Sequence, residues 1–101
     1  QVGLMRHRLQ VASWSLDAAL DAVGPDPAPS MDTVAAVMLA KREIALAGVE
    51  VCDLAMEVAG GSAYFRGSVI ERSYRDIRAA KFHPTTPEET LQLLGEQAFA
   101  V

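Results

Sequence analysis

Residues 31–59 form one uninterrupted stretch whose predicted helix is apolar around most of its circumference. At 1.5 Å per residue this helix is roughly 43 Å long. A helix so apolar over its girth is normally covered on several sides. The remaining segments are short by comparison, so we expect a missing segment or a second copy of the chain to cover it. Three rows at seven-residue spacing define the stretch: Val37, Ile44, Val51, Val58; Val34, Lys41, Gly48, Ala55; and Met38, Ala45, Cys52, Ala59.

A shorter helix is predicted before this stretch, because apolar residues recur there every three or four positions. It ends at residues 24–29, where three prolines in six residues cannot continue a helix. Ser30 or Asp32 can cap the start of the long helix. The apolar positions of the first helix are Met5, Leu9, Ala12, Leu16, Ala19 and Val23.

Two more helices are predicted after the long one. Ser68 with Glu71 has the spacing of a capping box, which opens a third helix that runs to about Ala80. Thr86 and Glu89 have the same spacing, with a proline at the first helical position, and open a fourth. No strand is predicted. We therefore expect residues 1–101 to form a single all-α domain, an antiparallel four-helix bundle.

Composition excludes several classes of protein. The net charge is −4 over 101 residues, with no basic stripe of the kind that binds nucleic acid. Cys52 is the single cysteine, so the chain has no intrachain disulfide and no metal-ligand spacing, and we expect no bound metal and a cytoplasmic setting. Neither a signal peptide nor a membrane span is predicted. The chain begins without Met inside a predicted helix, and we interpret it as part of a longer protein.

Three local features carry candidate chemistry. Gly60-Gly61 could let backbone approach a phosphate or a ring, although the commoner explanation is that Gly60 is the αL residue ending the long helix. Residues 71–78 hold five charges, which either pair on the helix surface or hold a loop or an anionic ligand. His83, before Pro84, is a candidate proton donor, acceptor or ligand contact, or a solvated loop histidine.

The order of features from Lys41 to Asp76 resembles the C-terminal domain of acyl-CoA dehydrogenases. In that family a long helix ends in a Gln-x-x-Gly-Gly-like motif, followed by Tyr or Phe and then by Glu-Arg and Arg-Asp. The corresponding residues here are Lys41, Ala55-Met56-Glu57-Val58-Ala59-Gly60-Gly61, Tyr64 and Glu71-Arg72-Ser73-Tyr74-Arg75-Asp76. The resemblance implies an incomplete bundle, since the family's N-terminal helical domain, β-barrel and first bundle helix are absent from this chain.

The resemblance also implies FAD binding at a subunit interface in a dimer or tetramer. Gly60 and Gly61 match the turn that lies along the adenosine-diphosphate part of FAD held mainly by a neighbouring subunit. Glu57 stands where the family usually has Gln. A carboxylate there would be repelled by the pyrophosphate, so it turns away or the contact is altered. The remaining matches, with a structural role in the helix and the following loop, are Arg72, Arg75 and Asp76.

The family's catalytic base marks a departure. It is commonly a Glu followed by Gly, eight residues after the Asp of Arg-Asp. Here Pro84 holds that position, with His83 before it, and proline cannot accept a proton through its side chain.

Three hypotheses follow. The chain is part of an FAD-dependent oxidoreductase that acts on an acyl-CoA or another small molecule, with its base outside these residues. Alternatively, it is part of a flavin-dependent monooxygenase of the same superfamily, in which His83 is catalytic. The third hypothesis is a non-catalytic helical oligomerisation module. Under each, the chain alone is expected to be inactive.

Overall fold

The computed structural model describes residues 1–25, 28 and 30–100, and these residues are helical without any strand. The predicted helices are confirmed, and residues 26, 27 and 29 of the predicted connector lie outside the described residues. The elements are α1 (Val2–Val23), α2 (Met31–Ala59), the 3-10 helix η1 (Gly60–Tyr64), α3 (Val69–Ile77), the 3-10 helix η2 (Arg78–Lys81) and α4 (Pro87–Phe99). The third helix is therefore shorter than predicted, because its last turn tightens into η2.

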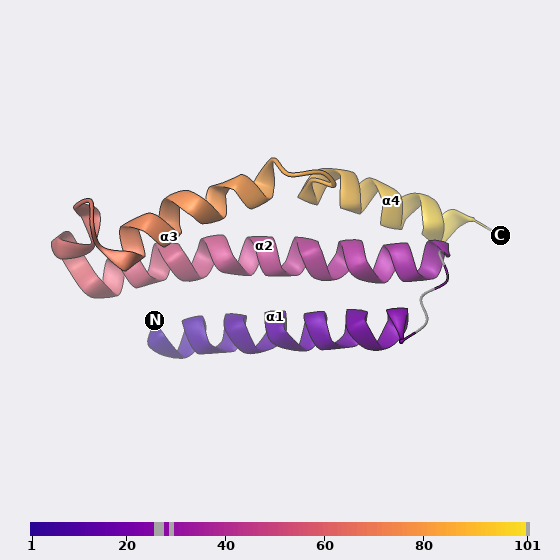
Figure 1. Ribbon diagram of the computed structural model, residues 1–101, viewed down its shortest axis with the longest axis horizontal. Coiled ribbons are helices and arrows are strands. Elements are labelled where there is room, and N and C mark those ends of the chain that lie inside the picture. Colours follow the sequence, from indigo (N-terminus) through magenta and orange to yellow (C-terminus); the bar gives the residue numbers. More distant parts are fainter. Residues whose placement is uncertain (26–27, 29, 101) are drawn as a thin grey trace.

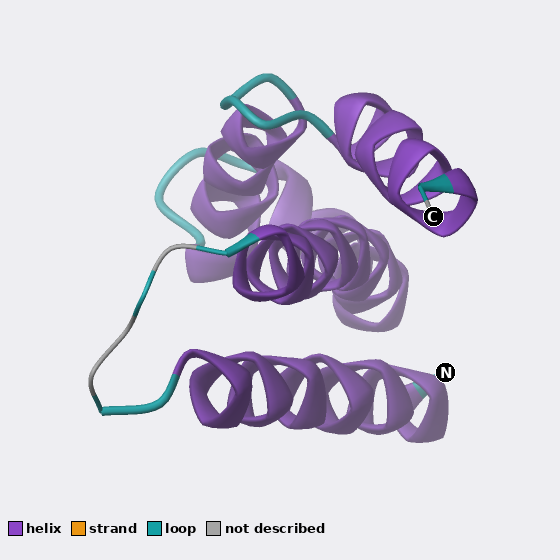
Figure 2. Cartoon of the chain, turned by 90° about the vertical axis from the view of Figure 1, so that its right-hand side faces the viewer, coloured by secondary structure: helices purple, strands orange, loops and turns teal. Residues whose placement is uncertain are grey.

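Helix α2 is the centre of the fold. Helix α1 runs antiparallel to it on one side, while α3 and then α4 run antiparallel to it on the other (Figure 1). The view along the bundle shows α1 separated by α2 from the α3–α4 layer (Figure 2). Within the described residues, every extensive contact between elements includes α2 or joins neighbours along the chain. The arrangement is thus an all-α antiparallel bundle with an open side, 52 Å long and 23 Å across.

Apart from Pro87 and Thr90 of α4, the buried residues that the structure describes are alanines and one valine. Small side chains let α1 and α2 approach closely, but they bury little apolar area for each residue. The larger apolar side chains lie outside, with Val37, Ile44 and Val58 of α2 all more than a third exposed. The expectation that the other helices leave α2 partly uncovered is confirmed. The buried apolar residues are Ala12, Ala19, Ala35, Ala40, Ala45, Ala47, Val49 and Ala63.

Side-chain caps set where α2 and α4 begin. Ser30 caps α2: its hydroxyl accepts a hydrogen bond from the Thr33 amide at 3.1 Å, and the Thr33 hydroxyl accepts one from the Ser30 amide. The predicted box at α4 is also confirmed, since Thr86 and Glu89 cap each other's amides in the same reciprocal way. Satisfying these amides stabilises each helix start by about 1 kcal/mol.

The cap of α3 is only half of the predicted box. The Ser68 hydroxyl accepts from the Glu71 amide at 2.9 Å, as predicted. The Glu71 carboxylate, however, accepts from Arg75 one turn further on, at 2.6 Å, so it pairs along the helix instead of reaching back. A charged donor on the same helix face outcompetes the backbone amide as its partner.

Gly60 ends α2 in a conformation different from the expected αL. Its φ of 76° is positive, but its ψ of −157° is extended, while its amide donates to the Met56 carbonyl oxygen. This region of backbone space is open essentially to glycine alone. The conformation turns the chain sharply away from the axis of α2 and into η1.

Candidate functional site

The glycine turn, defined as Gly60 and Gly61, follows the C-terminal end of α2, and both glycines are exposed. A Cβ added at either glycine would meet no atom of the chain within 4 Å. Behind the turn, Ala63 is only 2% exposed and its carbonyl oxygen accepts a hydrogen bond from the Ser68 hydroxyl at 3.2 Å. The segment after the turn is therefore fixed to the start of α3, while the backbone of the two glycines is open to a group from outside the chain.

Glu57 lies in the last turn of α2, three residues before Gly60. Its side chain is exposed, and one carboxylate oxygen accepts a hydrogen bond from the Gln1 side-chain amide at 2.7 Å. Gln1 is the residue before α1, so this contact draws the carboxylate toward the α1 side of the bundle.

The charged residues of α3 pair within that helix. Arg72 lies 3.5 Å from Asp76, and Arg75 pairs with Glu71. These are the two pairs that the four-residue spacing indicated, and the exposed Arg72–Asp76 pair contributes less than about 1 kcal/mol. The contacts that the structure records for Arg75 and Asp76 stay inside α3, so the loop before α4 is held by other residues.

Arg78, at the start of η2, makes a polar contact with α2. The sequence did not predict this contact. Its guanidinium lies 3.3 Å from the Asp53 carboxylate and 4.4 Å from the centre of the Tyr74 ring. Tyr74 is four residues before Arg78, a spacing that indicates contact on one helix face. Asp53 is 25 residues away, and no local pattern pointed to it.

His83 lies in the loop between η2 and α4. Two adjacent basic residues of α2, Lys41 and Arg42, donate hydrogen bonds to this loop and to the first residue of α4. The Lys41 Nζ atom is 3.0 Å from His83 Nδ1 and 3.3 Å from the His83 carbonyl oxygen, and it also donates to the Pro84 carbonyl oxygen. Next to it, Arg42 Nε donates to the Pro87 carbonyl oxygen at 3.2 Å. The His83 side chain itself remains exposed.

The glycine turn and His83 do not form one site. Lys41, which holds His83, is 19 residues before Gly60 on the same helix, or roughly 28 Å along its axis at 1.5 Å per residue. The two candidate groups therefore act at separate places on the surface of this chain.

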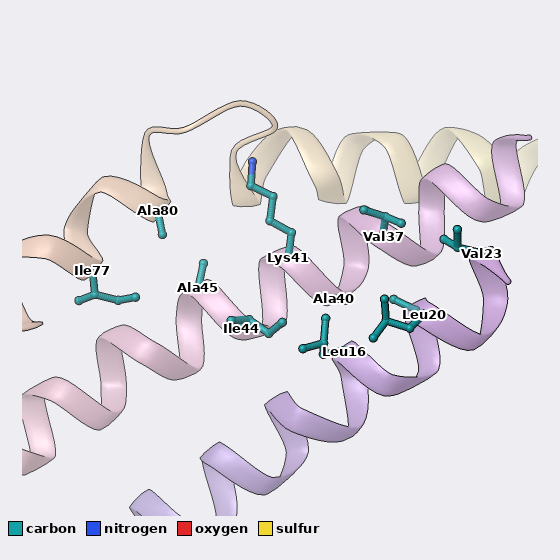
Figure 3. Close-up of a pocket in the computed structure, with 11 residues that line it drawn as sticks. Leu16, Leu20, Val23, Val37, Ala40, Lys41, Ile44, Ala45, Ile77 and Ala80 are labelled. Atoms are coloured by element: carbon teal, nitrogen blue, oxygen red, sulfur yellow. The ribbon is translucent and has the colours of Figure 1, made fainter. Parts of the chain in front are cut away.

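An apolar groove of about 470 Å³ opens between α1, α2 and α3 (Figure 3), and several of its lining side chains are exposed, among them Leu16, Leu20 and Val37. The aliphatic stem of Lys41 borders it, and the ammonium group reaches out toward the loop before α4. Large aliphatic side chains make most of its walls: Leu16, Leu20, Val23, Val37, Ile44 and Ile77.

A family model described as the acyl-CoA dehydrogenase C-terminal domain matches residues 1–88. The chain belongs to this family. The resemblance seen in the order of motifs is thereby confirmed, together with the all-α fold. The match to the acyl-CoA dehydrogenase C-terminal domain includes the glycine turn and His83, while most of α4 lies beyond it. No curated protein and no solved structure matches the chain.

Neither a metal-ligand cluster nor a membrane-spanning helix is found in the described part of this acyl-CoA dehydrogenase C-terminal domain. No group of three or more His, Cys, Asp or Glu side chains is placed to hold a metal ion there. None of its described helices combines the length and apolarity that crossing a membrane requires. Cys52 is half-buried in α2; burial raises the pKa of its thiol, the Asp53 charge adds to the increase, and the Arg78 charge opposes it.

Proposed function

We propose that this chain is the C-terminal part of an FAD-dependent oxidoreductase of the acyl-CoA dehydrogenase superfamily. In the intact protein, the glycine turn lies against the adenosine-diphosphate part of an FAD that an adjacent subunit holds. The FAD supplies the redox chemistry, by accepting a hydride or by reacting with oxygen once reduced. The contribution of this chain is binding surface, through the turn, and contacts between subunits.

Gly61 is the observation that carries the proposal. Gly60 is explained by its positive φ, which only glycine adopts easily, whereas Gly61 does not have a positive φ. Nothing in the chain comes within 4 Å of where a Gly61 Cβ would stand. Neither backbone conformation nor internal packing therefore calls for glycine at this position. The same is true of Gly95, so this feature supports the proposal only together with the family's glycine pair, whose bare backbone leaves room for a flat group from outside the chain.

The surroundings of the turn are compatible with an anionic cofactor, given the position of Glu57. A free carboxylate beside a diphosphate would weaken its binding. The hydrogen bond from Gln1 to Glu57 supports the first of the two possibilities that the resemblance raised, in which the carboxylate turns away from the cofactor.

The exposed apolar side chains support a homo-oligomer. Val37, Ile44 and Leu20 border the apolar groove, and Phe65 and Tyr64 lie exposed next to the glycine turn. These exposed side chains form two groups at separate places along α2, and exposed aromatic and aliphatic side chains are typical of protein interfaces. A turn used by a neighbour's cofactor requires such an interface close by.

Removing the charge of Glu57 is expected to strengthen FAD binding. Although the Gln1 contact turns the carboxylate aside, its charge stays within a few residues of the turn, so in the intact protein Glu57→Gln should lower the dissociation constant for FAD by about threefold at most. Titration of the apoprotein with FAD, followed by flavin fluorescence, measures this. Glu96→Gln on α4 removes the same charge far from the turn and should leave the constant unchanged.

An intact protein that purifies without flavin and does not bind it would refute the proposal. A Glu57→Gln variant that binds FAD no better than the Glu96→Gln control would show that the Glu57 carboxylate does not repel the cofactor. Bleaching of the bound flavin by an acyl-CoA identifies the dehydrogenase, whereas oxygen uptake with an aromatic substrate identifies the monooxygenase.

A further inference from the structure

The Lys41 ammonium group finds three acceptors in one short stretch of loop. They are the Nδ1 atom of His83, the His83 carbonyl oxygen and the Pro84 carbonyl oxygen. A lysine ammonium has three N–H donors and no acceptor, so these contacts use its full hydrogen-bonding capacity. Lys41 is thus committed to the loop and is not free to bind a ligand in the apolar groove beside it.

The contact to Nδ1 determines where the imidazole carries its proton. Because the ammonium group can only donate, the Nδ1 atom that it contacts must be unprotonated. In the neutral imidazole the remaining proton is then on Nε2. The two carbonyl contacts fix the backbone on both sides of the His83–Pro84 bond, and the Nδ1 contact fixes the ring.

We infer that Lys41 is a positioning residue that holds His83 in the Nε2–H tautomer, which leaves this N–H available to an oxygen acceptor of a ligand. The tautomer follows from this chain's geometry alone, while the presence of a ligand there rests on the monooxygenase alternative of the proposed function, in which His83 is catalytic. In this form His83 cannot take a proton from a ligand, since Nδ1 is occupied and Nε2 is already protonated. His83 is therefore not a replacement for the missing carboxylate base.

The ligand group that suits such a donor is an oxygen with partial or full negative charge, such as a carbonyl, phenolate or carboxylate oxygen. A single N–H donor aimed at oxygen stabilises charge that develops there. The exposure of the His83 ring, with Nδ1 held by Lys41, leaves Nε2 as the ring nitrogen available to such a group.

Nitrogen NMR of the histidine side chains tests the inference directly. In the intact protein labelled with ¹⁵N-histidine, at a pH where imidazoles are neutral, His83 should show the Nε2–H tautomer alone. His83→Gln identifies its resonances, and the exposed His7 serves as the internal reference for a ring free to exchange between tautomers. Lys41→Met should give His83 the same mixture as His7, while Lys41→Arg, also a pure donor, should keep the single tautomer.

A wild-type His83 with its proton on Nδ1, or with the mixture seen for His7, would overturn the inference without any variant being needed. Wild-type-like spectra for Lys41→Met would overturn the role of Lys41. Since these spectra do not depend on flavin, a protein without FAD would refute the proposed function and leave this inference standing.

Activity of the flavin-loaded protein separates a donor from a base. Gln places an amide N–H near the position of Nε2 but is not basic, so His83→Gln should keep turnover within roughly tenfold of wild type. His83→Ala, which has no donor, should lose roughly 100-fold. A loss of roughly 100-fold for both variants would show that His83 works as a base, and full activity of both would show that its N–H does not act on the substrate.

Discussion

Replacing Gly48 by leucine is expected to lower the free energy of unfolding by about 3 kcal/mol, because α3 packs directly on this glycine. A Cβ at Gly48 would lie 2.8 Å from Ile77 Cδ1 and 3.0 Å from Ile77 Cγ1. A leucine side chain there has no room between α2 and α3. It would force α3 away from α2 and strain the Arg78–Asp53 link next to it.

The size of the substituent decides the sign of this effect. Ile77 lines the open apolar groove, so the end of its side chain can move aside for a single methyl group. Gly48→Ala also gains about 1 kcal/mol of helix propensity, and we expect it to be neutral within about 1 kcal/mol. Gly95→Leu, in α4 with nothing within 4 Å, is the matched control and should not destabilise the protein. Urea denaturation followed by circular dichroism measures all three, and a Gly48→Leu variant as stable as Gly95→Leu would contradict this packing.

The two glycines of the glycine turn are expected to differ sharply in what they contribute to stability. Gly60→Ala should cost about 1–3 kcal/mol, because φ 76° and ψ −157° are strained for any residue with a Cβ. Gly61→Ala should be neutral or slightly stabilising, since its φ is not positive and its surroundings are empty. Thermal unfolding of the two variants side by side gives the comparison. Equal losses would show that Gly61 is also needed by the fold.

Local signals predicted most of the fold. The capping residues Ser30 and Thr86 marked two helix starts, and the apolar periodicity gave the extents of α1 and α2. These features depend on contacts within three or four residues, and sequence spacing reports such contacts directly. The same holds for the surface pairs of α3.

Contacts between helices far apart in sequence could not be predicted in this way. Lys41 and His83 are 42 residues apart, and their hydrogen bond depends on how η2 and the following loop return to α2. The close approach of Gly48 to Ile77 has the same origin. It depends on the position along the α2 axis at which α3 packs, and helical periodicity does not determine that position. The Gly60 conformation was also missed, because a glycine after a helix indicates a positive φ without indicating ψ.

The most direct test of the proposed cofactor contact is the affinity for FAD when Gly61 carries a side chain. Gly61→Val leaves the backbone conformation accessible and meets no atom of the chain near the new Cβ, so the fold itself does not oppose it. If a neighbour's FAD lies against the turn, the dissociation constant of the intact Gly61→Val protein should rise by about tenfold or more, since a side chain displaces the cofactor by more than an ångström. An unchanged dissociation constant, in a protein of unchanged thermal stability, would contradict the account.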